Sequence, residues 1–292
     1  MKIFVIGRHE LLLQTIETLS AAGHQIVGVV TSPGRPEYKA TASDFEERAK
    51  LEGASFLLKP TIDSEVLKVA RNSSADIAVS LNWVSVIDSN FTSQFKFGVL
   101  NCHAGDLPRY RGNAAPNWAI IRGESEIVFS VHQMVPGELD TGDVYLKKSL
   151  PLKPDDTIAD IGRFAEQVVP EMFCSVVNGL QDGSISVYSA NSVDADTGFR
   201  CYPRLPLDGL IDWSQSAKAI HNLVRSVTKP YSGAYTYFRD ENDKLQKLYI
   251  WVCEVETDKI SDVAVPGQIM HNDKESGVSR VYTGKGTLSL IT

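Results

Sequence analysis

Residues 1–16 read MKIFVIGRHELLLQTI, a short apolar run followed by a polar turn and a stretch with apolar residues at helical spacing. The run Lys2–Ile6 is typical of a buried strand, and Glu10–Ala22 is predicted to form a helix. An apolar run of about five residues is too short to span a membrane or to serve as the core of a signal peptide. We therefore expect a cytoplasmic protein.

The same alternation of strands and helices continues through the first half of the chain. Further strands are predicted at Gln25–Val30, Ala54–Leu58, Asp76–Leu81 and Phe97–Cys102. Helices are predicted at Ser43–Glu52, with Ser43 as the N-cap, and at Thr61–Asn72. This alternation predicts an α/β fold with a Rossmann-like, mostly parallel sheet covered by helices on both faces. No GxGxxG follows the first strand, so we expect no bound dinucleotide.

The second half of the chain changes character. Strands are predicted at Ile127–Met134 and Gly142–Leu152, and a helix at Thr157–Leu180. Periodicity is then lost, and we predict an N-terminal catalytic domain over 1–190, a linker over 191–206 and a smaller domain over 207–292. This last domain has a predicted helix, Ser216–Val227, followed by strands at Ala234–Arg239, Lys247–Glu256, Gly267–Met270, Val278–Thr283 and Leu288–Thr292. Short strands at this spacing indicate a small β-barrel or sandwich.

Composition excludes some classes of function. The hydrophobic content of 43% and charged content of 22% are ordinary for a soluble globular protein. A net charge of −7 argues against a protein that mainly binds nucleic acid, because such proteins usually carry a basic face. The four cysteines form no CxxC pair and no cluster with histidine at zinc spacing, so we expect free thiols and no metal.

Asn101 and His103 stand at the end of a predicted strand, where ligands of parallel sheets bind. Residues two apart on an extended chain point to the same side, so an amide donor lies beside an imidazole that can take up a proton. This pair is half of an acyl-transfer site. Taken alone, however, a strand-end histidine is more often structural, and an asparagine before a turn is usually a turn residue.

A second polar group lies downstream, where Asp140 and Asp143 flank Thr141 and Gly142 in a turn that leads into a strand. A carboxylate close to His103 would hold its tautomer and raise its basicity. Such a segment is most often an ordinary β-turn, and the sequence alone does not determine whether either aspartate reaches His103.

Three motifs together resemble the formyltransferase family that uses N10-formyltetrahydrofolate. They are Asn101-Cys102-His103, Leu107-Pro108-Arg109-Tyr110-Arg111-Gly112 and Leu139-Asp140-Thr141-Gly142. The resemblance covers nearly the whole chain, and DGLIDWSQSAKAIHNLVRSVTKPYSGAYTYF resembles the start of the family's second, OB-like domain. That segment is most similar to enzymes acting on nucleotide-linked amino sugars, including the one that formylates UDP-4-amino-4-deoxy-arabinose.

The resemblance implies a catalytic set and a mechanism. Asn101, His103 and Asp140 would form the set, with Asn101 stabilising the tetrahedral oxyanion and His103 removing the proton of the attacking amine. Asp140 would orient His103 and assist proton transfer to the leaving nitrogen. No metal and no covalent enzyme intermediate are needed. The chain departs from the family's common His-Pro-Ser-Leu-Leu-Pro, since it reads HAGDLP over His103–Pro108. We interpret Asp106 as the residue in place of the family's serine and as a candidate substrate contact.

The resemblance also implies binding residues for both substrates. For N10-formyltetrahydrofolate, held by two loops, they are Leu81, Trp83, Val84, Ile87, Val135, Gly137, Glu138, Leu139 and Asp140. Trp83 is equally consistent with a core position. For the diphosphate and sugar of the acceptor, the candidates are Arg8, His9, Asp106, Arg109, Tyr110, Arg111, Arg204, Asn222 and Arg225. Taken one at a time, the basic residues of this set and Asn222 are more often solvated surface residues. Tyr110 or Tyr202 is a candidate for stacking on the base.

The predicted function is transfer of a formyl group to the primary amine of a UDP- or dTDP-linked amino sugar, for lipopolysaccharide or other surface glycan biosynthesis. The partners expected are small molecules, with no nucleic acid and no membrane, and a homodimer is an option through the β-rich domain. The main alternative is methionyl-tRNA formyltransferase. It is disfavoured because residues 207–292 carry balanced charges without a basic cluster. Glycinamide ribonucleotide formyltransferase and a folate-binding protein without activity are weaker alternatives.

Overall fold

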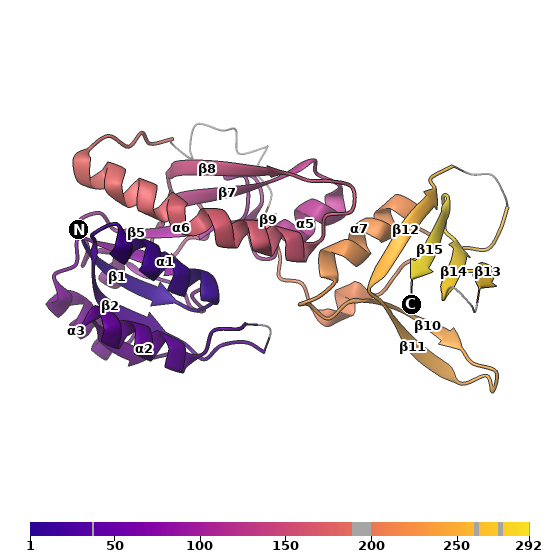
Figure 1. Cartoon of the computed structure of the whole chain (residues 1–292), viewed down its shortest axis with the longest axis horizontal. Coiled ribbons are helices and arrows are strands. Elements are labelled where there is room, and N and C mark those ends of the chain that lie inside the picture. Colours follow the sequence, from indigo (N-terminus) through magenta and orange to yellow (C-terminus); the bar gives the residue numbers. More distant parts are fainter. Residues whose placement is uncertain (37, 189–199, 260–262, 274–276, 292) are drawn as a thin grey trace. The chain divides into compact units, whose positions relative to one another are not determined.

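The computed structural model describes residues 1–36, 38–188, 200–259, 263–273 and 277–291, which divide into two compact units (Figure 1). Unit 1 comprises Met1–Gly112, Val128–Leu150 and Arg163–Arg200. Unit 2 comprises Asn113–Ile127, Pro151–Gly162 and Cys201–Thr292. The predicted linker, 191–206, lies outside the described residues from 191 to 199. Among the described residues, no helix combines the length and hydropathy needed to cross a bilayer.

Unit 1 is built on a seven-stranded sheet in the order β3-β2-β1-β4-β5-β7-β8 (Figure 1). Its strands are β1 (Lys2–Gly7), β2 (Gln25–Thr31), β3 (Ser55–Leu58), β4 (Ile77–Leu81), β5 (Val99–His103), β7 (Glu126–Gln133) and β8 (Val144–Pro151). The five strands from β3 to β5 are parallel, and β7 pairs with β5 in the antiparallel direction. The prediction of a Rossmann-like, mostly parallel sheet is confirmed.

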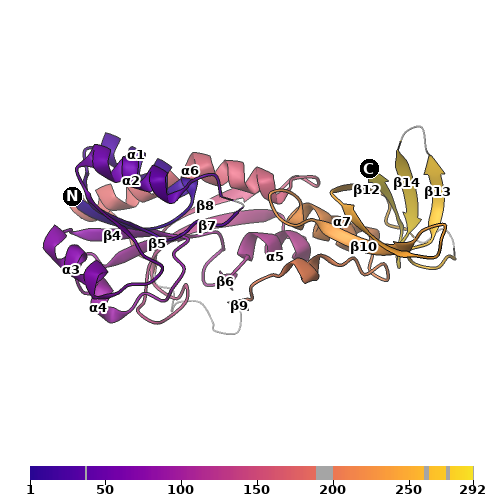
Figure 2. The ribbon, with the colours of Figure 1, turned by 90° about the horizontal axis from the view of Figure 1, so that it is seen from below.

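Helices cover both faces of this sheet (Figure 2). They are α1 (Glu10–Ala21), α2 (Ala42–Glu52), α3 (Ser64–Ser73), α4 (Ser89–Thr92) and α6 (Ile158–Asp182). Between α3, α4 and the sheet, the rings of Phe4, Phe91 and Phe95 pack with centroids 5.1–5.8 Å apart, inside a core that includes Val66 and Val99. Burial of these large apolar side chains stabilises the sheet, whose strands β5 and β7 carry the polar residues of the candidate site.

Two predicted helix starts are wrong by one to three residues, for the same physical reason. Helix α2 begins at Ala42 with Thr41 as N-cap, not Ser43, because Thr41 and Asp44 form a capping box. The Thr41 N–H donates to Asp44 Oδ2 over 2.7 Å. Helix α3 begins at Ser64 rather than Thr61, because Asp63 accepts from the N–H groups of Glu65 and Val66. In each case the residue that accepts the exposed N–H groups sets the boundary.

Unit 2 contains a helix that the sequence did not reveal, α5 (Ala115–Arg122), which packs against α7 (Ala217–Val227). The predicted helix Ser216–Val227 is confirmed, with Ser216 as its N-cap. Helix α5 follows Ala114, which has a left-handed backbone and provides no side-chain cap, so the usual start signal is absent. The Asn117 amide donates to the Ser226 carbonyl oxygen over 2.7 Å and joins the two helices.

The remaining strands of unit 2 are short and antiparallel, as predicted for a β-rich second domain. Strands β10 (Ala234–Arg239) and β11 (Leu245–Ile250) form a hairpin, and β12 (Val252–Thr257), β15 (Thr287–Ile291), β14 (Val278–Tyr282) and β13 (Ile269–Asp273) form a sheet in that order. The chain also contains three short elements, which are β6 (Arg111–Gly112), β9 (Arg200–Cys201) and the 3-10 helix η3 (Pro206–Gly209).

The single strand predicted over Lys247–Glu256 is wrong. It is two strands in different sheets, since β11 pairs with β10 and β12 pairs with β15. The chain changes partner at Trp251, whose carbonyl oxygen accepts a hydrogen bond from Thr228 Oγ1 over 3.2 Å. Apolar alternation runs through both strands, so the pattern contains no sign of the break.

Candidate active site

Strands β5 and β7 bring two polar side chains face to face in the middle of unit 1. Asn101 on β5 lies directly opposite His132 on β7, and its amide Nδ2 is 3.2 Å from His132 Nε2. His103, two residues after Asn101, is the last residue of β5 and is 9% exposed. The amide and the imidazole predicted from the Asn-x-His motif are therefore both present at the end of this strand.

Asp140 connects the two strands from the loop that follows β7. Its Oδ2 lies 3.5 Å from His103 Nδ1, and its Oδ1 lies 3.4 Å from His132 Nε2. Oδ2 also accepts a hydrogen bond from the Gly112 N–H over 3.0 Å. Of the two aspartates considered from the sequence, Asp140 is the one placed beside His103. Asn101, His103, His132 and Asp140 together are called the polar cluster below.

Burial and charge set the protonation of this cluster. Burial lowers the pKa of His103, and the Asp140 carboxylate and the Tyr110 carbonyl oxygen oppose that effect only in part. Burial acts to raise the pKa of Asp140, but contacts with His132, His103 and the Gly112 N–H lower it overall. At neutral pH the cluster therefore holds a carboxylate beside a neutral His103, which is a ring able to accept a proton.

The loop between β5 and α5 closes around His103. His103 Nε2 lies 2.6 Å from the Tyr110 carbonyl oxygen, and Tyr110 itself is buried. A Cβ at Gly105 would lie 2.5 Å from His103 Nε2 and 2.7 Å from the Tyr110 oxygen, so only glycine fits this contact. The interpretation that Asp106 replaces the family's serine is wrong, because Gly105 is the third residue of HAGDLP and therefore matches the serine of His-Pro-Ser-Leu-Leu-Pro. This loop thus has a close approach that a serine would prevent.

Lys147 binds the same loop through Asp106 and the Leu107 backbone. Lys147 Nζ donates to Asp106 Oδ1 over 2.7 Å and to the Leu107 carbonyl oxygen over 2.6 Å. Both side chains are more than one third exposed, so solvent screens this ion pair. Asp106, a predicted substrate contact, is thus engaged by a lysine of β8.

The two loops predicted to hold the folate lie against each other in unit 1. The Gly137 N–H donates to the Ile87 carbonyl oxygen over 3.1 Å, and Leu81 ends β4. Trp83 packs against the phenylalanine core, with Nε1 buried and without a hydrogen-bond partner among the described residues. Val84 and Leu139 are exposed, whereas Glu138 accepts a hydrogen bond from Thr141. Val135 lines the pocket described next.

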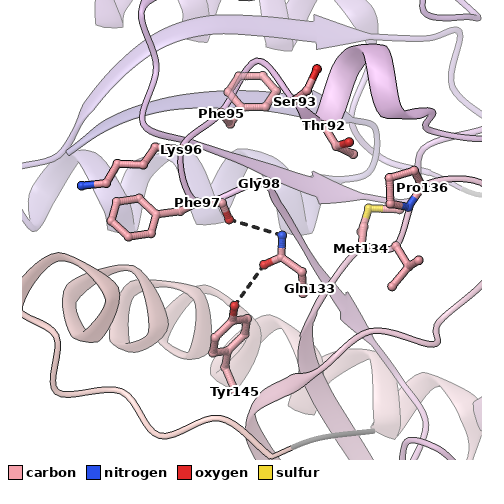
Figure 3. Close-up of a pocket in the computed structure, with 11 residues that line it drawn as sticks. Thr92, Ser93, Phe95, Lys96, Phe97, Gly98, Gln133, Met134, Pro136 and Tyr145 are labelled. Atoms are coloured by element: carbon pink, nitrogen blue, oxygen red, sulfur yellow. Dashed lines mark hydrogen bonds between the residues drawn. The ribbon is translucent and has the colours of Figure 1, made fainter. Parts of the chain in front are cut away.

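A pocket of about 580 Å³ lies beside the second of these loops (Figure 3). Figure 3 shows Gln133 at its floor, where Oε1 accepts from the Tyr145 hydroxyl over 3.0 Å and Nε2 donates to the Phe97 carbonyl oxygen over 3.4 Å. The walls come from Thr92, Ser93, Phe95, Lys96, Phe97, Gly98, Met134, Val135 and Pro136. The lining is mixed, since polar and apolar side chains contribute to it in similar numbers.

Arg8 and His9 follow β1 at the carboxyl edge of the sheet. The Arg8 guanidinium lies 5.4 Å from the Tyr38 ring centroid and donates to the Pro33 carbonyl oxygen over 3.0 Å. His9 caps α1 by accepting from the Leu11 N–H, and burial lowers its pKa. In the loop after β5, the Arg109 guanidinium lies 5.5 Å from the Tyr110 ring. The Nε atoms of Arg8 and Arg111 are buried without a hydrogen-bond partner in the part of the chain that the structure describes.

The other predicted substrate residues belong to unit 2. Arg204 lies over the Trp118 ring at 4.7 Å and donates to the Asp208 carbonyl oxygen. The backbone carbonyl oxygen of Tyr202 accepts from Trp118 Nε1, and the Tyr202 side chain is exposed. Asn222 and Arg225 are buried and hydrogen-bonded to each other over 3.0 Å. Arg225 Nη1 also donates to the Asp156 carbonyl oxygen over 2.7 Å.

His132 is the member of the polar cluster that the sequence did not reveal. It is 1% exposed, and it lies directly across from Asn101. The signal was its place near the end of a predicted strand, but only the antiparallel register of β5 and β7 brings it to Asn101. Among the described residues, no group of histidine, cysteine and carboxylate side chains is arranged to hold a metal.

Known families match both parts of the chain. Residues 1–177 match the family model described as "Formyl transferase", and residues 206–292 match "Formyl transferase, C-terminal domain". Among curated proteins, the methionyl-tRNA formyltransferase of Citrifermentans bemidjiense is 32% identical over 100% of this chain and 87% of its own length. That of Geobacter metallireducens is 30% identical over 99% of this chain and 89% of its own length.

Solved structures share the fold at low identity. The N-formyltransferase from Helicobacter canadensis, in complex with folinic acid and dTDP-3-aminofucose, has a TM-score of 0.72 at 14% identity, covering 100% of this chain and 99% of that chain. WlaRD, a sugar 3N-formyl transferase in the presence of dTDP and 5-N-formyl-THF, has a TM-score of 0.71 at 14% identity, covering 99% and 96%.

Proposed function

Because the chain belongs to the formyltransferase family, we propose that it transfers a formyl group from N10-formyltetrahydrofolate to the primary amine of a UDP- or dTDP-linked amino sugar. The observation that carries the reaction is the placement of Asn101, His103 and Asp140 within 3.5 Å contacts of one buried cluster. An amide donor, a neutral imidazole and a carboxylate are the groups that amine formylation requires.

In the proposed mechanism His103 takes up the amine proton. The Tyr110 carbonyl oxygen can only accept, so the proton of the neutral ring lies on Nε2 and Nδ1 is the nitrogen able to bind another. The amine nitrogen attacks the formyl carbon, its proton passes to His103, and the carbon–N10 bond breaks as N10 gains a proton. Asp140 stabilises the transient imidazolium. One proton leaves the amine and one reaches N10, so the transfer balances.

Asn101 stabilises the negative charge on the formyl oxygen. Its amide nitrogen has two N–H groups, one of which points to His132. The other is available to the oxygen when the carbonyl carbon becomes tetrahedral. Loss of one such donor typically costs on the order of 100- to 1000-fold in rate.

The predicted folate loops fit a heterocycle with hydrogen-bonding edges. Trp83 Nε1 and Ser85 Oγ are buried in the first loop without a hydrogen-bond partner among the described residues. The hydrogen bond between Gly137 and Ile87 joins that loop to the second one. Bound N10-formyltetrahydrofolate supplies the activated formyl group. We assign its binding to Leu81, Trp83, Val84, Ile87, Val135, Gly137, Glu138, Leu139 and Asp140.

A diphosphate requires cations with unsatisfied donors. Arg8 and Arg111 each have a buried Nε without a partner in the described part of unit 1. They therefore support the assignment of a nucleotide-linked acceptor more directly than Asn222 and Arg225, whose polar atoms are bonded within unit 2. The N-formyltransferases of similar fold, whose structures were determined with dTDP or with dTDP-3-aminofucose, favour the same acceptor class.

Charged initiator tRNA is the second candidate acceptor. The methionyl-tRNA formyltransferases at about 30% identity along the full chain favour it. Residues 207–292 have balanced charges, which does not suit an RNA-binding surface. We place the amino-sugar reaction first, in a cytoplasmic enzyme of surface glycan synthesis that uses small-molecule partners and is able to form a homodimer.

One experiment tests both acceptors. Purified protein and N10-formyltetrahydrofolate are incubated with a panel of UDP- and dTDP-linked amino sugars, and each sugar is examined by mass spectrometry for the gain of one CO unit. Methionyl-tRNA is formylated in a parallel tube, and the His103→Asn variant is the control. A gain on one sugar that the variant does not produce supports the proposal. If only the tRNA is formylated, methionyl-tRNA formylation replaces the amino-sugar reaction as the function of this protein.

A further inference from the structure

His132 has a fixed tautomer in this structure. Its Nδ1 lies 2.9 Å from the carbonyl oxygen of Gln133, and a carbonyl oxygen only accepts hydrogen bonds. Nδ1 therefore carries a proton, and if this is the only proton on the ring, Nε2 is a hydrogen-bond acceptor. The ring is almost fully buried, so water does not compete for that nitrogen.

The amide nitrogen of Asn101 lies 3.2 Å from this acceptor. Asp140 Oδ1 is farther, at 3.4 Å, which exceeds the usual N–H···O distance. An amide has a donor end and an acceptor end of almost equal size. If the Asn101 amide turned over, its oxygen would face the lone pair of Nε2, and two acceptors would then oppose each other in a buried site.

We propose that His132 is a positioning residue that holds the Asn101 amide with its nitrogen toward the reacting centre. This inference rests on the proposed formyl transfer. It explains why Asn101 presents its nitrogen, a donor, and not its oxygen to the developing oxyanion. His132 does not touch the reacting atoms, and it acts through Asn101.

Several neighbouring groups surround His132 without providing the same control. Asp140 and His103 are the other titratable groups of the polar cluster, and Ser130 Oγ, on the same strand, donates to the Gly105 carbonyl oxygen. Among the described contacts of the Asn101 side chain, the one to His132 is the hydrogen bond that fixes the amide. A ring of the same size without an acceptor nitrogen would fill the space and lose this control.

The test is a double-mutant cycle on formyl transfer with His132→Phe, Asn101→Ala and the pair. We expect His132→Phe to lower kcat by about 10-fold or more while KM for both substrates changes by less than about threefold. In the Asn101→Ala background the same change should alter kcat by less than about twofold, because coupled residues are not additive. If the double variant loses kcat by the product of the two single-variant losses, the two residues act independently and the inference is overturned.

A conservative variant separates positioning from packing. His132→Gln places an amide oxygen that can accept from Asn101, so it should recover most of the lost kcat, and the thermal unfolding midpoint reports whether each variant folds. Equal loss in the Gln and Phe variants, both folded, would show that packing and not the acceptor is responsible.

A measurement on the unaltered protein does not depend on any variant's activity. Nitrogen-15 NMR of histidine-labelled protein should show His132 neutral, with the proton on Nδ1; the signal is assigned by its absence in His132→Gln. A proton on Nε2 would overturn the inference even if an amino sugar is formylated. The expected tautomer without formylation of any amino sugar would leave the inference standing and overturn the proposed acceptor.

Discussion

Two buried polar groups, one in each unit, differ in how their atoms are satisfied. In unit 2, Arg225, Asn222 and Asn117 make hydrogen bonds of 2.7–3.0 Å to one another's helices and to backbone oxygens. In the polar cluster of unit 1, the bonds to backbone groups are equally short, at 2.6–3.0 Å, but the contacts between side chains are longer, at 3.2–3.5 Å. Short, saturated bonds stabilise a fold, whereas incompletely satisfied groups are available for chemistry.

The largest effect that this comparison predicts is loss of the base. His103→Asn should lower the rate of formyl transfer by at least about 100-fold, because a positioned acid–base group contributes that much. The asparagine is smaller, and its amide can take the place of Nδ1 beside Asp140 but does not reach the position of Nε2 at the Tyr110 carbonyl oxygen. The thermal unfolding midpoint reports whether the variant folds. A variant that keeps more than a tenth of the rate would show that His103 is not the base.

Gly105→Ala should act on the cluster without removing any of its polar atoms. The added methyl group would lie 2.5 Å from His103 Nε2, so the ring or the Tyr110 carbonyl must move. We expect kcat to fall by about 10-fold, since displacements of about 1 Å at reacting groups cost up to about 100-fold. Gly162→Ala is the matched control, because nothing lies within 4 Å of its Cβ, and it should leave kcat unchanged.

In unit 2, Arg225→Met should lower stability, whereas the changes in the polar cluster lower activity. It leaves the Asn222 and Asp156 oxygens without a donor, so the free energy of unfolding should fall by about 1–3 kcal/mol. Denaturant unfolding measures this loss. The control is Lys218→Met, which removes the same charge from an exposed position on the same helix. Unchanged stability together with a raised KM for the acceptor would instead support the substrate contact predicted for Arg225.

The smallest predicted effect is a shift in the pH at which activity is lost. Because burial lowers the pKa of His103, the acid limb of kcat/KM should lie below the ordinary imidazole value of 6.5. Above that limb His103 is neutral and able to take a proton, and activity is lost as the pH falls through it. The Asp140 carboxylate raises the pKa of His103, so Asp140→Asn should move the limb of its residual activity to still lower pH. A limb above 6.5 would contradict the neutral base.

The sequence determined much of this protein by itself. Apolar runs of strand length alternating with helical periods are local properties, so the parallel sheet, most of its helices and the β-rich second domain could be predicted from them. Helix starts were less accurate, since Thr41 and Asp63 had to be chosen among several nearby capping side chains. The three spaced motifs were sufficient to predict Asn101, His103 and Asp140 as the catalytic set, and their roles stay a prediction.

Only the tertiary structure decided which polar groups meet. Antiparallel pairing of β5 with β7 puts His132 opposite Asn101, and the fold of the loop after β7 selects Asp140 rather than Asp143 as the neighbour of His103. The packing of α5 against α7 buries Asn222 and Arg225, which look like surface residues in the sequence. Register and burial depend on contacts between segments far apart in the chain, and local patterns of residues do not contain that information.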